Sequence, residues 1–366
     1  MAVIEPELSA DMASYRFDER PFLVFWEVTR ACALACRHCR AEAQSRPHPD
    51  QLDEQAAMKL VRQLTELRPP MLILTGGDPL MRPDVLKLAR EASDLGLRVA
   101  LSPSATALLE KADFSEFIDA GIKRISLSLD GATRETHDRF RGVKGTFDRT
   151  IKAVQKAHAA GLSVQINTTL TRGNIDEFPE FRDLMFVLKP AMWSVFLVVP
   201  TGRAGVEDLP DPQDLERVFE ELADLVGKAP LDIKTTEGHH FRRVLMQRGK
   251  GGTASKMRKR SPLGIRDGRG VMFISHTGEV SPSGFLPIDC GNVRERDPAE
   301  IYREHPLFVS LRDSDALGGK CGRCEYRKVC GGSRSRAWAL TGDPFAEEPL
   351  CPYEPAARTT SIQQTT

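Results

Sequence analysis

The chain has 366 residues with 51 basic and 51 acidic side chains, so its formal net charge is zero. This balance excludes an overall field that attracts nucleic acid or an anionic membrane, and the composition is that of an ordinary globular protein. No apolar run is long enough to cross a bilayer, and the polar first stretch, residues 1–20, lacks the apolar segment of a secretory signal. We therefore expect a cytoplasmic protein without nucleic-acid or membrane partners.

Six short segments rich in Val, Ile and Leu have the composition of strands that are covered on both faces. Amphipathic helical patterns separate them, and glycines follow several of these helices. This alternation predicts an α/β fold, a partial (β/α)6 TIM-like barrel over residues 21–235 that follows a polar N-terminal extension, 1–20. The predicted strands are Leu23–Val28, Met71–Thr75, Leu97–Leu101, Arg124–Leu129, Ser163–Thr169 and Trp193–Val199.

A loop with three cysteines follows the first predicted strand. Cys32, Cys36 and Cys39 have the spacing C-x3-C-x2-C. Three thiolates so close together can hold three corners of a 4Fe-4S cubane and leave the fourth iron without a protein ligand. An open iron is a place for chemistry, and parallel barrels carry their chemistry at the C-terminal ends of the strands. The loop is therefore predicted to lie at the mouth of the barrel.

The remaining cysteines belong to a different region. Residues 236–270 are Gly-rich and basic, which fits either a solvated linker or a loop that meets an anionic substrate. Residues 271–366 should form a small domain, with a hairpin over Val271–Val280 and a helix over Ile301–Leu311. Four further thiols can close a second cluster or bind a structural zinc ion. They are Cys321, Cys324, Cys330 and Cys351.

A second motif, Thr75-Gly-Gly-Asp-Pro79, follows the second predicted strand. With the three-cysteine loop before it, the chain resembles radical S-adenosylmethionine (SAM) enzymes. The resemblance implies that SAM binds the open iron through its amino and carboxylate groups. It also implies that Gly76, Gly77 and Asp78 take the place of a Gly-Gly-Glu motif that holds the SAM methionine moiety, although Asp shortens the reach.

Further cofactor-binding residues follow from the same resemblance. His38 stands where the family has an aromatic residue near the adenine, and a solvated loop histidine is the alternative. Ser126, Ser128 and Asp130 alternate at the end of the fourth strand and are expected to contact the ribose or the SAM carboxylate; a capped strand end is the alternative. Asn167 lies at a similar strand end, as do Ser102, Ser104 and Thr169. Arg141 fits either a partner of the SAM carboxylate or an exposed ion pair.

The C-terminal region resembles the SPASM or twitch extension of radical SAM enzymes, which binds auxiliary clusters. A full SPASM domain has a cysteine soon after its Gly-Glu hairpin, where this chain has Ser281-Pro-Ser283. We therefore expect one auxiliary 4Fe-4S cluster on the four C-terminal thiols, with Cys290 as a free or optional ligand.

The resemblance implies reductive cleavage of SAM to a 5′-deoxyadenosyl radical that abstracts hydrogen from substrate, with a flavodoxin or ferredoxin as reductant. The stretches Phe25–Cys32 and Cys39–Glu42 look closest to the haem and haem d1 branch, which favours decarboxylation or removal of a tetrapyrrole propionate. Basic residues of 248–269 and three further arginines, Arg203, Arg334 and Arg336, suit propionates. A peptide-modifying maturase is the first alternative, and a non-catalytic iron–sulfur electron carrier is the second.

Overall fold

The computed structural model describes residues 15–249 and 264–356. Its strands form one continuous sheet in the order β10-β9-β1-β2-β3-β4-β5-β6-β7, and β8 pairs with β9. The strands are β1 (Leu23–Glu27), β2 (Met71–Thr75), β3 (Val99–Leu101), β4 (Ile122–Ser128), β5 (Ser163–Leu170), β6 (Met192–Leu197), β7 (Asp232–Thr236), β8 (Arg266–Asp267), β9 (Gly270–Ile274) and β10 (Val280–Ser281).

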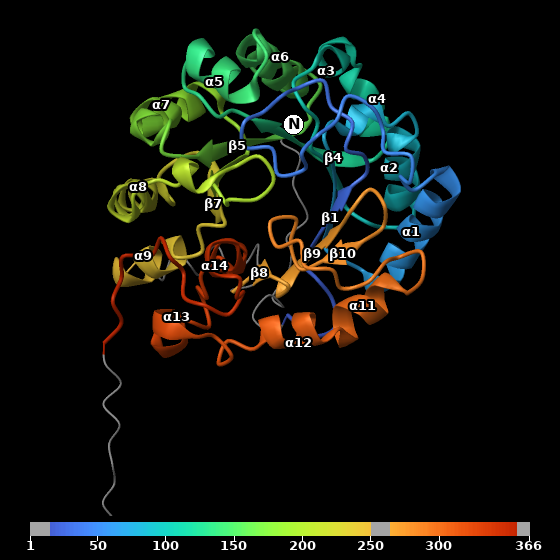
Figure 1. Ribbon diagram of the computed structural model, residues 1–366. Helices are drawn as coiled ribbons and strands as arrows, with labels where there is room; N and C mark the ends of the chain where they lie inside the picture. Colours follow the sequence, from blue (N-terminus) through green and yellow to red (C-terminus); the bar gives the residue numbers. More distant parts are fainter. Residues whose placement is uncertain (1–14, 250–263, 357–366) are drawn as a thin grey trace, which may run out of the picture.

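Helices connect the strands and cover the outside of the curved sheet (Figure 1). In the barrel they are α1 (Glu54–Leu67), α2 (Val85–Asp94), α3 (Ala107–Lys111), α4 (Phe114–Asp119), α5 (Arg134–Arg141), α6 (Thr146–Ala159), α7 (Phe178–Leu188), α8 (Pro212–Leu225) and α9 (Phe241–Gln247). Short 3-10 turns are η2 (Pro79–Met81), η3 (Ile175–Glu177) and η4 (Val206–Asp208). The last helices are α11 (Pro298–Glu304), α12 (Pro306–Arg312), α13 (Gly319–Arg323) and α14 (Arg334–Thr341).

The helices begin where the sequence offers a cap and bury one apolar face. In α1, the Asp53 side chain accepts a hydrogen bond from the Ala56 backbone amide, which satisfies one of the free donors at the helix start. Leu60, Val61 and Leu64 then line the buried face at helical spacing. The other connecting helices also pack on the sheet through a buried apolar face. One large hydrophobic core therefore lies between the helices and the strands.

Parallel pairing from β1 to β7 confirms the predicted partial barrel. All six predicted strands are present, and β7 adds a seventh parallel strand beside β6. Along each strand, residues facing the helices are almost fully buried, whereas alternate residues face the inside of the barrel and several stay partly exposed. Parallel strands all end at one edge, so the loops that follow β1, β2, β4 and β5 meet at the mouth.

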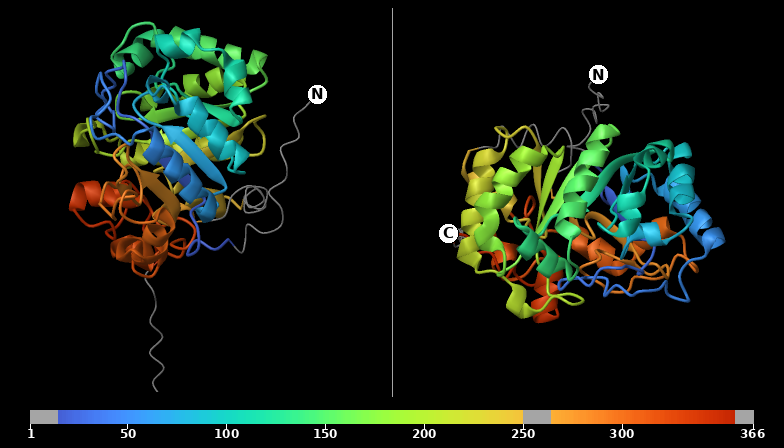
Figure 2. Two further views of the ribbon diagram at one scale, coloured as in Figure 1. Left: turned by 90° about the vertical axis from the view of Figure 1, so that its right-hand side faces the viewer. Right: turned by 90° about the horizontal axis from the view of Figure 1, so that it is seen from above.

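The sheet continues across the predicted boundary at residue 270. β9 pairs with β1 in parallel, and β10 turns back antiparallel on β9, which confirms the predicted hairpin. Helices α11, α12 and α13 complete the ring of helices between α1 and α9 (Figure 1). The side view shows this C-terminal part below the barrel helices, directly against the first strands (Figure 2).

The single helix predicted over Ile301–Leu311 is wrong, because the structure has two helices there, α11 and α12. Pro306 begins α12, and the backbone of the residue before a proline is disfavoured in a helix. His305 is accordingly extended and caps α12 through its ring nitrogen. Most of the basic segment 248–269 lies outside the described residues. Within residues 15–249 and 264–356, every helix is too short or too polar to span a bilayer.

Candidate active site

Three thiols lie on the loop after β1, and each sulfur already accepts a hydrogen bond. The Leu34 backbone amide donates to Cys32 Sγ at 3.3 Å, and the Ala43 amide donates to Cys39 Sγ at 3.4 Å. The third sulfur, on Cys36, receives a guanidinium N–H from α5 at 3.5 Å. Donors to cluster thiolates orient the ligands and raise the reduction potential of the cluster they hold. These donors suit thiolate ligands, and the role of the three cysteines as cluster ligands stays a prediction.

The loop is fixed from several elements of the barrel. The Cys32 amide donates to the Gln44 carbonyl, which closes the two ends of the loop on each other. Arg203, which follows β6, donates through its guanidinium to the carbonyls of Cys36 and Ala43 at 3.3 and 2.6 Å. Arg203 was predicted to contact a substrate propionate. In this structure its guanidinium also holds the cysteine loop, and its predicted contact with a propionate stays a prediction.

Gly76 and Gly77 lie beside the start of the cysteine loop. A Cβ on Gly76 would come within 2.4 Å of the Thr29 carbonyl oxygen, and one on Gly77 within 2.6 Å of the Ala31 carbonyl oxygen. Backbone hydrogen bonds join the same segments, from Gly77 N to Thr29 O and from Asp78 N to Ala31 O. Only glycine permits this contact, so the two glycines bring the end of β2 against the cluster loop. Their predicted role in SAM binding stays a prediction.

Asp78 connects the ends of two strands. It is completely buried, and its carboxylate accepts hydrogen bonds from the Leu80 and Ser104 amides and from Thr106 Oγ1, the last at 2.8 Å. Burial raises the pKa of this carboxyl, and the hydrogen bonds only partly offset that rise. The sequence did not indicate Thr106. Ser104 also donates to the Gly77 carbonyl at 2.8 Å, and its hydroxyl lies 3.6 Å from Cys32 Sγ.

Asp130 acts on the cluster loop through Arg141. Its carboxylate accepts from the Thr169 amide at 2.7 Å and forms an ion pair with Arg141, whose other terminal nitrogen bonds Cys36 Sγ. Burial opposes ionisation of Asp130, but Arg141, the two neighbouring histidines His38 and His137 and the Thr169 amide together hold its pKa below the ordinary value. Arg141 is largely buried, so the exposed ion pair considered from the sequence is wrong. A carboxylate–guanidinium–thiolate chain thus joins β4, α5 and the loop.

The other predicted cofactor contacts lie around the same mouth. The His38 ring lies 4.2 Å from the ring of Phe140, and burial lowers the pKa of His38 to about 4, so it is neutral at physiological pH. Its Nδ1 atom is buried and has no hydrogen-bond partner in the part of the chain that the structure describes. Ser126, Ser128 and Asn167 point to the inside of the barrel from β4 and β5. Their contacts with SAM stay predictions.

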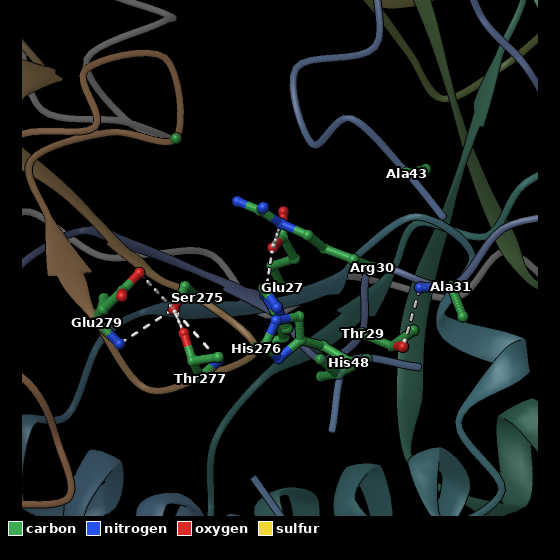
Figure 3. Close-up of polar contacts among 12 residues, drawn as sticks. Glu27, Thr29, Arg30, Ala31, Ala43, His48, Ser275, His276, Thr277 and Glu279 are labelled. Atoms are coloured by element: carbon green, nitrogen blue, oxygen red, sulfur yellow. Dashed lines mark hydrogen bonds and ion pairs between the residues drawn. The ribbon is translucent and has the colours of Figure 1, made fainter. Parts of the chain in front are cut away.

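An ion network ties the C-terminal hairpin to the cysteine loop (Figure 3). Glu27, at the end of β1, is completely buried and pairs with Arg40 at 2.5 Å and Arg30 at 3.2 Å, one residue from each side of the loop. His276, beyond β9, places Nδ1 2.9 Å from the same carboxylate. Burial alone would raise the pKa of Glu27, but Arg40, His276 and Arg30 together lower it to about 2.

The four C-terminal cysteines surround one cavity. Cys321, Cys324, Cys330 and Cys351 all line it, together with the cationic side chains of Arg243 and Lys320. Backbone amides donate to their sulfurs, for example from Glu348 to Cys321 at 3.2 Å and from Gly332 to Cys330 at 3.4 Å. Burial raises the pKa of Cys330 to about 12, so metal binding there must release a proton. Among the described residues, no three Cys, His, Asp or Glu side chains are grouped as one metal ion would require.

Two neighbouring arginines form hydrogen bonds within this region and do not face a substrate. Arg334 donates to the carbonyls of Pro344 and Ala346, and Arg336 is bonded to Glu348 and to the Glu237 carbonyl. Both arginines are fully buried, so their predicted contact with substrate propionates is wrong in this structure. Cys290 does not line the four-cysteine cavity. It lies in the main core, where its thiol donates to the Ile288 carbonyl.

Both thiol sets suit iron–sulfur clusters by the chemistry of their donors. Each set has N–H donors aimed at its sulfurs, and the four C-terminal cysteines also line one cavity. A family model described as the radical SAM superfamily matches residues 26–185. This span holds the cysteine loop, the Gly-Gly-Asp turn and the strands β2 to β5.

Two relatives are similar over nearly the whole chain. The AdoMet-dependent heme synthase of Oleidesulfovibrio alaskensis is 42% identical, covering 91% of this chain and 87% of its own. The protein of the same name from Methanosarcina barkeri is 38% identical, over 92% and 98%. The chain belongs to the radical SAM superfamily. Family membership implies a 4Fe-4S cluster and SAM as cofactors. It also confirms that the chain is an enzyme, against the alternative of a non-catalytic electron carrier.

More distant likenesses fit the same family. A PqqA peptide cyclase of Rhizobium meliloti is 28% identical, over 92% of this chain and 88% of its own. Among solved structures, Streptococcus suis SuiB bound to S-adenosylmethionine has a TM-score of 0.67 at 19% identity, covering 92% of this chain and 78% of SuiB. At that identity the likeness supports the radical SAM fold and carries no statement about substrate.

Proposed function

We propose that this radical SAM enzyme acts in haem-type biosynthesis and oxidatively decarboxylates propionate side chains of an iron-coproporphyrin. One observation carries the proposal: the two relatives named AdoMet-dependent heme synthase are about 40% identical across nearly all of both chains, well above the 28% of the peptide cyclase. The similarity spans the C-terminal part as well as the barrel.

The residues of the mouth have distinct tasks in this proposal. Cys32, Cys36 and Cys39 would hold the cluster, and bound SAM would supply the radical that removes a hydrogen atom from the propionate chain. Gly76 and Gly77 keep the β2 turn against the loop, and Asp78 fixes that turn. Backbone groups of the turn are then available to the SAM methionine moiety. We assign His38, Ser126, Ser128, Asp130 and Asn167 to the surrounding SAM site.

The four C-terminal thiols are proposed to bind one auxiliary 4Fe-4S cluster. Their arrangement around a cavity, rather than around a single point, supports a cluster over a zinc ion. Oxidative decarboxylation leaves one electron on the substrate, and an auxiliary cluster is a suitable acceptor for it. A flavodoxin or ferredoxin is the proposed external reductant for the first cluster.

The function is tested by anaerobic turnover. Reconstituted enzyme is incubated with SAM, dithionite and iron-coproporphyrin, and the porphyrin is analysed by mass spectrometry. We expect successive losses of carbon dioxide from the porphyrin together with 5′-deoxyadenosine. Unchanged porphyrin alongside continued SAM cleavage would contradict the substrate and favour the peptide-modifying alternative.

The auxiliary cluster has a separate test in the iron content. Replacing Cys32, Cys36 and Cys39 together by alanine should abolish SAM cleavage and leave about half of the iron, because the C-terminal set is intact. Complete loss of iron would contradict a second cluster. Replacement of Cys290 alone by alanine is the matched control, because that thiol lies in the core, and should leave the iron content unchanged.

A further inference from the structure

One lysine inside the barrel has no role in the interactions described so far. Lys234 lies in the middle of β7, and its register partner on β6 is Ser194, which pairs in turn with Asn167 on β5. Residues that pair across parallel strands share a face, so these three side chains form one layer of the barrel interior. They lie below the strand ends where the cysteine loop and the Gly-Gly-Asp turn meet.

This layer presents hydrogen-bond donors. Asn167 Oδ1 accepts a hydrogen bond from Gln165 Nε2 at 2.7 Å, which leaves the Asn167 amide NH₂ free to donate into the interior. The Ser194 hydroxyl lies 3.2 Å from that of Thr236. No carboxylate or other acceptor pairs with the Lys234 ammonium within residues 15–249 and 264–356. Asp232 lies two residues before Lys234 on the same face of β7, and a lysine ammonium beside neutral amide and hydroxyl donors suits a further anionic ligand.

The electrostatics of the layer also favour an anionic ligand. Burial, and the positive charge of Arg124 on β4, lower the pKa of Lys234 to about 8, which leaves it mostly protonated at neutral pH. A carboxylate bound to Lys234 would stabilise the charged form of the lysine. Two arginines first considered for this task, Arg334 and Arg336, are fully buried and bond backbone carbonyls and Glu348.

We propose that Lys234 binds a carboxylate of the substrate inside the barrel and so positions the substrate below the SAM site, to which Asn167 is assigned. The proposal rests on the proposed function, since a tetrapyrrole with propionate side chains brings several carboxylates to the mouth. Lys234 would then set specificity for acidic substrates and take no part in bond breaking.

The test compares an acidic ligand with its neutral ester. Reconstituted holoenzyme is titrated with iron-coproporphyrin and with its methyl ester, and binding is followed by the porphyrin absorbance. K234M should weaken binding of the acid roughly tenfold to hundredfold, the cost of one charge-assisted hydrogen bond, and leave the ester unchanged. K234R should restore most of the affinity. K123M, which removes an exposed lysine from β4, is the matched control and should bind as wild type.

The outcomes separate this assignment from the proposed function. Equal binding of the acid by wild type and K234M would overturn the role of Lys234, while normal decarboxylation by wild type would keep the function. Equal weakening of acid and ester, without rescue by K234R, would also overturn the carboxylate assignment and leave a packing role. Wild-type enzyme that neither binds nor converts iron-coproporphyrin would overturn the proposed function itself.

Discussion

Arg141 is the residue whose task differs most between sequence and structure. In the sequence it is one of many arginines on a polar helix, and only the fold brings it between Asp130 and Cys36. A guanidinium beside a cluster thiolate adds positive charge and a hydrogen bond, and both stabilise the reduced, more negative cluster. We therefore propose that Arg141 would position and tune a cluster held by Cys36, with Asp130 orienting Arg141.

Replacing Arg141 by methionine should slow SAM cleavage roughly tenfold to hundredfold, as losses of partners around metal ligands commonly do. The midpoint potential of the SAM-binding cluster, measured by redox titration with electron paramagnetic resonance, should move to a more negative value. The double variant R141M/D130N removes the buried charge that R141M leaves unpaired, so it separates a cluster effect from a folding effect. R139M, on the exposed face of α5, is the control, and a wild-type potential in R141M would contradict this role.

At the scale of elements, Glu27 is the point where three segments meet. It is the last residue of β1, and it holds Arg30 and Arg40 on the cysteine loop and His276 beyond β9. The stretches Phe25–Cys32 and Cys39–Glu42, which contain the glutamate and both arginines, resemble the haem branch of the family in sequence. The structure shows what these residues do. Glu27 pairs with Arg30 and Arg40, and the two ion pairs hold the cysteine loop over the end of β1.

Replacing Glu27 by glutamine should lower the free energy of unfolding by about 3–5 kcal/mol, because it leaves buried Arg40 without its counter-charge. The pKa of Glu27 is depressed in the folded protein, so its stabilising effect is present above the unfolded pKa of about 4 and is lost as pH falls toward 2. The difference between wild type and E27Q in denaturant titrations should therefore shrink below about pH 4. Glu54→Gln, which breaks an exposed pair with Lys87, should have a much smaller effect, and equal losses would contradict the network.

The strands and their helical crossovers could be predicted because each signal is local. Runs such as Met71–Thr75 are apolar on both faces, and the caps and glycines stand next to the elements that they end. Pairing of β9 with β1 could not be predicted, since no local pattern joins segments so far apart in the sequence. The same limit explains the wrong roles given to Arg334 and Arg336, which the fold buries among partners on other segments. Lys234 could have been found from the alternation in its strand, which places it on the interior face.

At the scale of the whole molecule, the C-terminal part is continuous with the barrel. β9 extends the sheet beside β1, α11 packs on α1, and Arg336 joins the end of β7 to the four-cysteine region. The two thiol sets are thus held in one framework, and Lys234 lies on the interior face of the same sheet. This arrangement suits the proposed substrate, which would give a hydrogen atom at the SAM site and an electron to the proposed C-terminal cluster.

In the proposed reaction, the 5′-deoxyadenosyl radical formed from SAM removes a hydrogen atom from a propionate chain of an iron-coproporphyrin. The most direct measurement uses iron-coproporphyrin deuterated in its propionate chains, with reconstituted enzyme, SAM and dithionite under anaerobic conditions. We expect deuterium in the 5′-deoxyadenosine, in proportion to the carbon dioxide lost from the porphyrin. Unlabelled 5′-deoxyadenosine with an intact porphyrin would contradict it.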